Sequence, residues 1–129
     1  MVGIVIVSHS QKLAEGVVEI AKMMADKDAP IVAAGGMEDG GPGTSFEKIS
    51  RAVEEVYSDE GVAILVDMGS AVMTAEMVIE AMEDCRIKLI DGPVAEGAVL
   101  AAVEAKMGSS LDIIAQRVEK ARGMKKLSE

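Results

Sequence analysis

The stretch VGIVIVSHS, residues 2–10, decides the fold, because an apolar run ends there in a short polar turn. Apolar residues in every position are typical of a strand buried on both faces of a parallel sheet. Apolar residues at helical spacing follow and predict a helix from about Gln11 to Ala25. A buried strand that leads directly into a helix is the opening unit of an α/β fold.

The rest of the chain repeats this alternation of strand and helix. Further strands are predicted at 31–34, 62–66 and 87–90, and helices at about 46–57, 71–82, 94–106 and after Ser110. Lys88 in the middle of the last strand indicates a strand at the edge of the sheet. The pattern predicts an α/β fold of three layers, in which an open parallel sheet carries helices on both faces. We expect residues 1–129 to form one domain.

Composition argues against several classes of function. The net charge is −9, whereas nucleic-acid binding needs clustered lysine and arginine. No apolar run approaches the roughly 20 residues of a membrane span, and the N-terminus lacks the features of a signal peptide. Cys85 is the single cysteine, so we expect it to fill space near a helix end rather than form a disulfide. These features indicate a cytoplasmic protein without nucleic-acid or membrane partners.

His9, the single histidine, stands where the first strand ends. If the first and third strands are neighbours, Asp67 lies beside His9, because Asp67 follows the third strand. A neutral imidazole accepts a phosphoryl group on one nitrogen, and a carboxylate at the other nitrogen fixes its tautomer and orientation. The sequence therefore predicts phosphoryl relay, with His9 as the nucleophile and Asp67 as the residue that orients it.

A phosphoryl group on His9 needs donors around its oxygens. Hydroxyls are offered by Ser10, Thr44 and Ser70, and close backbone approach by Gly35, Gly36 and Gly69. Each residue also has a purely structural alternative. His9 can cap the helix that follows it or fill space in the core, Asp67 can cap its own following helix, and the glycines can form a flexible turn.

Other kinds of site fit the sequence less well. One histidine and one cysteine do not make a zinc site, and neither a Walker motif nor a dinucleotide fingerprint is present, so we expect no metal and no cofactor. A receiver domain phosphorylated on Asp67 would need acidic residues after the first strand. A flavin module would need more aromatic side chains than Phe46 and Tyr57.

Four motifs resemble a known family, the phosphoryl-donor subunits of phosphoenolpyruvate-dependent dihydroxyacetone kinase. The motifs are IVIVSHS with LAEG (4–10, 13–16), AGG with GTS (34–36, 43–45), DMGSA with TAE (67–71, 74–76) and PVAEGA (93–98). Met68 stands where leucine is usual, and a bulkier apolar residue is more usual near Val94. This family is in turn similar to the mannose-type IIA domains of sugar phosphotransferase systems.

The resemblance implies a sheet in the order 2-1-3-4 and a homodimer. It implies that His9 takes phosphate from the phosphohistidine of the carrier protein HPr. The phosphate would pass to ADP held on a nucleotide-binding kinase subunit, while a third subunit holds dihydroxyacetone. The alternative is the IIA component of a mannose-type sugar-transport system, which passes its phosphate to a IIB partner.

Overall fold

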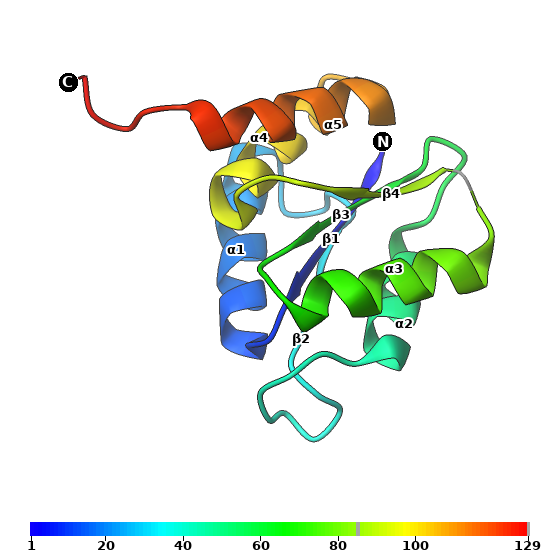
Figure 1. The fold of residues 1–129 in the computed structure, drawn as a ribbon. Helices are drawn as coiled ribbons and strands as arrows, with labels where there is room; N and C mark the ends of the chain where they lie inside the picture. Colours follow the sequence, from blue (N-terminus) through cyan, green and yellow to red (C-terminus); the bar gives the residue numbers. More distant parts are fainter. Residues whose placement is uncertain (85, 129) are drawn as a thin grey trace.

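The computed structural model describes residues 1–84 and 86–128, and within them four strands form one parallel sheet (Figure 1). The order in the sheet is β2-β1-β3-β4, which confirms the predicted order and the edge position of the strand that holds Lys88. The bounds are β1 (Gly3–Ser8), β2 (Ile31–Gly35), β3 (Val62–Val66) and β4 (Ile87–Ile90).

Helices cover both faces of the sheet, as the strand and helix pattern predicts (Figure 1). On one face lie α1 (Gln11–Met24), α4 (Val94–Lys106) and α5 (Leu111–Lys120), which continues into a 3-10 turn, η1 (Ala121–Gly123). On the other face lie α2 (Phe46–Val56) and α3 (Ser70–Met82). The α/β fold in three layers is therefore confirmed.

The core consists of two apolar clusters, one on each side of the sheet. Successive side chains of a strand point to opposite faces. Ile4 and Ile6 accordingly join the cluster under α1, α4 and α5, and Val5 and Val7 join the cluster under α2 and α3. Every residue of β1 and β3 is buried. The close packing around these two central strands fixes the position of the residues that follow each of them in the chain.

Serine side chains cap three of the helices in the described chain. Ser10, Ser45 and Ser110 each accept a hydrogen bond from the backbone N–H three residues ahead. Such a cap stabilises a helix by about 1 kcal/mol. Ser45 rather than the adjacent Thr44 caps α2, and the hydroxyl of Thr44 forms other contacts.

Gly35 lets the first turn of α1 lie against the end of β2. A Cβ atom on Gly35 would lie 2.6 Å from the carbonyl oxygen of Ser10 and 2.8 Å from the Cβ of Ala14. We expect Gly35→Ala to push the start of α1 away from the sheet. The free energy of unfolding, measured in urea, should fall by about 1–3 kcal/mol.

Gly16 provides the matched control in the same helix. Apart from its chain neighbours and the backbone of the same helix, no atom lies within 4 Å of the position of a Cβ on Gly16, so Gly16→Ala adds no clash. Alanine is the better helix former, and the substitution should raise stability by about 0.5–1 kcal/mol. A Gly35→Ala chain as stable as the wild type would contradict the close packing described above.

Tyr57 and its neighbours form a polar cluster at the end of the sheet where the strands begin. The Tyr57 hydroxyl donates to the Asp84 carboxylate, and Arg86 pairs with Asp84 and lies 5.3 Å from the centre of the Tyr57 ring. The hydrogen bond with Tyr57 lowers the pKa of Asp84 to about 2, and the same bond raises the pKa of Tyr57. The cluster ties the end of α2 to the turn before β4.

Two further expectations concern membrane-spanning helices and Cys85. None of the helices described here combines the length and the hydrophobicity that a bilayer crossing requires. Cys85, expected to fill space near a helix end, lies outside the described residues.

Candidate functional site: a histidine and a carboxylate at the carboxyl end of the sheet

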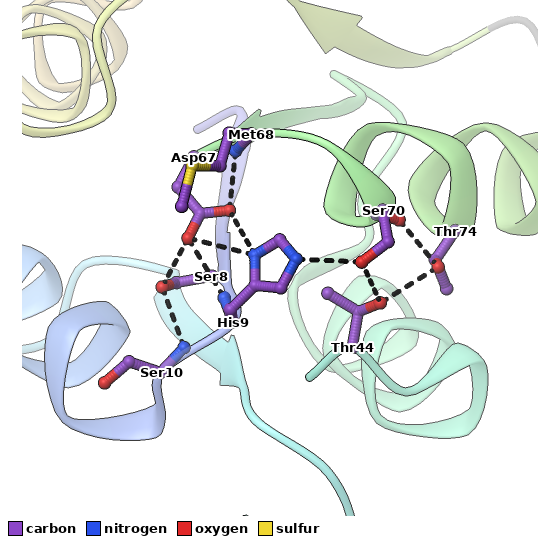
Figure 2. A network of polar contacts seen from close by, with 8 residues as sticks. All are labelled: Ser8, His9, Ser10, Thr44, Asp67, Met68, Ser70 and Thr74. Carbon is purple, nitrogen blue, oxygen red and sulfur yellow. Dashed lines mark hydrogen bonds and ion pairs between the residues drawn. The ribbon is translucent and has the colours of Figure 1, made fainter. Parts of the chain in front are cut away.

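Two side chains meet where β1 and β3 end side by side. His9 follows β1 and Asp67 follows β3, and the pairing of Val7 with Val66 brings the two strand ends level. The Nδ1 atom of His9 lies 3.1 Å from Oδ1 and 3.3 Å from Oδ2 of Asp67 (Figure 2). The structure thus joins an imidazole and a carboxylate from two neighbouring parallel strands.

Asp67 is held by donors on both carboxylate oxygens. Oδ1 accepts from the Met68 N–H at 2.7 Å, and Oδ2 accepts from the His9 N–H at 3.0 Å and the Ser8 hydroxyl at 2.8 Å. Burial works to raise the pKa of Asp67, but the hydrogen bonds from His9, Ser8 and Met68 together outweigh it and lower the pKa. Asp67 is therefore an ionised carboxylate, only 12% exposed, at neutral pH.

The ionised carboxylate determines which nitrogen of the neutral His9 ring carries the proton. A carboxylate only accepts hydrogen bonds, so Nδ1 must be the N–H that faces it. Nε2 then keeps its lone pair and accepts from the Ser70 hydroxyl at 2.8 Å. The side chain of His9 is 31% exposed, so the ring reaches the surface of the molecule.

Three hydroxyl groups lie on the side of the ring toward which this nitrogen points, and that of Ser70 contacts it (Figure 2). The Thr44 hydroxyl lies 3.4 Å from that of Ser70 and 3.1 Å from that of Thr74. Thr74 donates to the carbonyl oxygen of Ser70 at 2.8 Å, so its hydroxyl accepts from Thr44. Thr44 comes from the loop after β2 and Ser70 from the start of α3, and together they bring two hydroxyls to the side of His9 that faces α3.

A hollow opens beside His9 toward the start of α1. Its volume is about 390 Å³, and it is lined by His9, by the first turn of α1 (Ser10, Gln11, Lys12 and Glu15) and by Gly40–Pro42 of the loop after β2. The N–H groups of a first helical turn have no partners within the helix and attract anions. A larger hollow of about 670 Å³ lies between α4 and the segment after α5 and includes none of these site residues.

The sequence matches one protein family over residues 3–115, which include the whole sheet and every residue of the site described above. The family is EIIA-man, the PTS system fructose IIA component. The chain belongs to the EIIA-man family.

Within the EIIA-man family, similar proteins are phosphoryl donor subunits called DhaM. The chain is 40% identical over 117 residues to the phosphoryl donor subunit of the phosphoenolpyruvate-dependent dihydroxyacetone kinase 1 of Listeria innocua, covering 91% of this chain and 92% of that one. It is 37% identical over 118 residues to the corresponding Escherichia coli subunit, covering 87% of this chain but 25% of that one. The chain therefore belongs with the DhaM subunits of the EIIA-man family.

A solved structure shows the same fold. The phosphotransferase system component EIIA from Streptococcus agalactiae superposes with a TM-score of 0.72 at 18% sequence identity, over 97% of this chain and 96% of that one. At this level of identity, the likeness shows a shared fold and no more.

The other residues predicted for the site have different roles in the structure. Ser10 lines the hollow, but its hydroxyl caps α1 and points away from the ring (Figure 2). Gly35 packs against α1, and the Gly36 N–H donates to the Ser8 carbonyl oxygen. Gly69, with a φ of +53°, is the N-cap residue of α3, so the alternative in which Asp67 caps this helix is wrong. Only Asp67 and Ser70 form hydrogen bonds to the His9 ring among the residues described.

Sequence reasoning missed Ser8 and Thr74 as site residues. Ser8 is the last residue of β1, and its hydroxyl bonds to Asp67. Thr74 follows Ser70 by one helical turn and bonds to Ser70 and Thr44. The available signal was the position of each residue: Ser8 precedes His9 at the strand end, and Thr74 shares a helix face with Ser70.

Asp67 makes the stability of the fold depend on pH in the acid range. Its pKa is lower in the folded chain than the ordinary value of about 3.9, so the ionised group favours folding above that value. This contribution is lost as the pH falls through the ordinary pKa toward the lower folded pKa. We expect the free energy of unfolding of the wild type to fall more steeply below about pH 4 than that of Asp67→Asn. Urea unfolding at a series of pH values measures the two slopes, and equal slopes would contradict the depressed pKa.

Proposed function

We propose that this chain is a phosphocarrier that takes a phosphoryl group on Nε2 of His9 and hands it to a second protein. The observation that carries the proposal is the arrangement of the ring: Asp67 holds Nδ1, and Nε2 presents its lone pair toward the Ser70 hydroxyl at the surface. We further propose that residues 1–129 act as a single carrier domain.

The donor is the phosphohistidine of HPr. The Nε2 lone pair attacks the phosphorus atom, the new N–P bond forms, and the donor nitrogen keeps the electron pair of the bond that breaks. The phosphorylated ring carries a positive charge, because Nδ1 keeps its proton throughout. The ionised Asp67 carboxylate stabilises that charge, so the transfer needs no proton to move.

Hydroxyl and backbone groups bind the phosphoryl oxygens. When Nε2 is phosphorylated, the Ser70 hydroxyl loses its acceptor and donates to a phosphoryl oxygen. The Thr44 hydroxyl beside it donates as well, once its proton turns from Thr74 to the phosphoryl group. Ser10, Gly35, Gly36 and Gly69 shape the backbone around this pocket. The start of α1 borders the hollow beside His9, where its N–H groups and dipole favour negative charge.

The acceptor is ADP held on the nucleotide-binding kinase subunit, which works with a dihydroxyacetone-binding subunit. An oxygen of the ADP β-phosphate attacks the phosphorus, the N–P bond breaks, and Nε2 recovers its lone pair. The names of the Listeria innocua and Escherichia coli relatives, both phosphoryl donor subunits of a dihydroxyacetone kinase, support this acceptor. They favour it over a IIB protein of a sugar-transport system. We also propose that the chain acts as a homodimer.

Two reactions test the proposal. In the first, the chain is incubated with phosphoenolpyruvate, the general phosphotransfer enzyme and HPr, and its intact mass is measured. We expect the mass of one phosphoryl group to be added, stable in alkali and lost in acid. An unchanged mass, or a label that maps to Asp67 or a serine, would refute the carrier role of His9.

The second reaction separates the two acceptors. The phosphorylated chain is mixed with the kinase subunit carrying ADP, or with a mannose-type IIB protein. Loss of the label with formation of ATP in the first mixture supports the kinase role. Transfer to IIB and none to ADP would support the sugar-transport alternative.

A further inference from the structure

Ser8 places a fully buried hydroxyl behind the carboxylate of Asp67. The Ser8 side chain has no exposed surface, and its hydroxyl donates to Oδ2 of Asp67 at 2.8 Å. The same oxygen of Ser8 accepts from the N–H of Ser10 at 3.0 Å. Because a carboxylate only accepts and a backbone N–H only donates, the direction of both hydrogen bonds is settled. Figure 2 shows this chain of contacts on the side of Asp67 away from Ser70.

The register of the sheet explains why these two groups meet. Val7 pairs with Val66, and the Asp67 N–H donates to the Val7 carbonyl oxygen at 3.2 Å, so Ser8 and Asp67 come next to each other. Ser8 continues the face of the sheet to which Ile6 belongs, and Asp67 continues the face to which Leu65 belongs. Both therefore point to the side of the sheet that α1 covers.

Ser8 contacts the two segments whose relative position sets the geometry of the site. Its hydroxyl is bonded to the N–H of Ser10, the cap of α1, and to the carboxylate that follows β3. Both carboxylate oxygens lie close to Nδ1, Oδ1 at 3.1 Å and Oδ2 at 3.3 Å, and Ser8 holds the second of them from the side away from the ring. Without the hydroxyl, the N–H of Ser10 would lose its acceptor and Oδ2 would lose one of its donors.

We propose that Ser8 is a positioning residue for phosphoryl transfer, acting through Asp67 to keep the proton of His9 on Nδ1. The inference rests on the proposed function, since it concerns the reactivity of Nε2. Ser8 touches neither the imidazole nor the place of the phosphoryl group. Its effect is to hold the carboxylate in the orientation that selects the reactive tautomer.

The test reads the tautomer directly. The chain has one histidine, so a long-range proton–nitrogen NMR spectrum of the ¹⁵N-labelled protein shows one pair of ring nitrogens. We expect the neutral wild-type ring to carry its proton on Nδ1, and Ser8→Ala to shift part of the population to Nε2–H. We also expect phosphate uptake from phospho-HPr to slow about tenfold, as the loss of a hydrogen bond to a charged group allows.

Three further variants make the result decisive. Ser8→Thr keeps the hydroxyl and should keep the wild-type tautomer. Ser8→Cys keeps a side chain of similar shape with a weak donor, and it should resemble Ser8→Ala even if the alanine chain folds poorly. Ser110→Ala removes the cap of α5, far from the site in the chain, and should lower stability without changing the tautomer.

The outcomes separate this inference from the proposed function. A wild-type tautomer in Ser8→Ala and Ser8→Cys overturns the positioning role, and so does a slower rate with an unchanged tautomer. A shift in Ser110→Ala as large as that in Ser8→Ala also overturns it, because general destabilisation then explains both. The tautomer is measured without any phosphoryl donor. A wild-type chain that takes no phosphate would therefore contradict the proposed function, and the effect of Ser8 on the tautomer could still be measured.

Discussion

Replacing His9 with glutamine is expected to abolish phosphate uptake from phospho-HPr. An amide side chain can occupy the place of the imidazole and contact Asp67 or Ser70, but it has no nitrogen lone pair that can attack phosphorus. The intact mass of His9→Gln should therefore stay unchanged after incubation with the full donor system. Uptake should fall below detection rather than by a measurable factor.

A displaced histidine provides the control for His9→Gln. Gln116 is an exposed residue of α5, so Gln116→His should leave the fold intact. The double variant with His9→Gln and Gln116→His has one histidine that lacks a carboxylate and hydroxyls arranged as they are at His9. We expect it to remain unphosphorylated. Label on the double variant would show that any exposed imidazole is phosphorylated. It would contradict the claim that Asp67 and the hydroxyls around His9 are needed for phosphate uptake.

Replacing Asp67 with asparagine is expected to produce the second largest loss. The amide has an NH₂ group that donates, so Nδ1 of His9 can accept from it and the ring proton can move to Nε2. A proton on Nε2 occupies the lone pair that must attack phosphorus. A wrong tautomer of this kind lowers the rate of a histidine-dependent reaction by roughly 10⁴-fold. Single-turnover transfer from phospho-HPr measures the rate.

Asp91→Asn is the matched control for Asp67→Asn. Asp91 also follows a strand, β4, at the same end of the sheet, but its carboxylate pairs with Arg122. The same chemical change there should leave the rate of phosphate uptake unchanged. If Asp67→Asn retained at least a third of the wild-type rate, Asp67 would not set the tautomer of His9.

The fold could be predicted from the sequence because its signals are local and strong. Each strand is a short apolar run and each helix has an apolar face, and these patterns persist wherever the element lies in the fold. The position of β1 between β2 and β3 is harder to predict from the sequence, since strand order depends on contacts between distant segments. Motifs shared with a family predict this order, and the structure confirms it.

The site was only partly predictable, for a related reason. His9 and Asp67 could be paired because both follow predicted strands, and strand ends are visible in the sequence. The choice between Nδ1 and Nε2 was not visible, because it depends on which side of the ring faces the carboxylate. The role of Ser8 depends on the register between two strands, which is fixed only once the chain has folded. Thr74 was within reach of sequence reasoning, because it follows Ser70 by four residues in a predicted helix.

Tyr57 lies at the opposite end of the sheet from His9, and this separation has a practical consequence. The chain has one tyrosine and no tryptophan, so its intrinsic fluorescence arises at the Tyr57–Asp84 contact. Quenching by that carboxylate should disappear when the chain unfolds, and it should not change when His9 is phosphorylated or replaced. Light emission therefore monitors folding alone, so a variant altered at the histidine can be judged for structural integrity without interference from its chemistry.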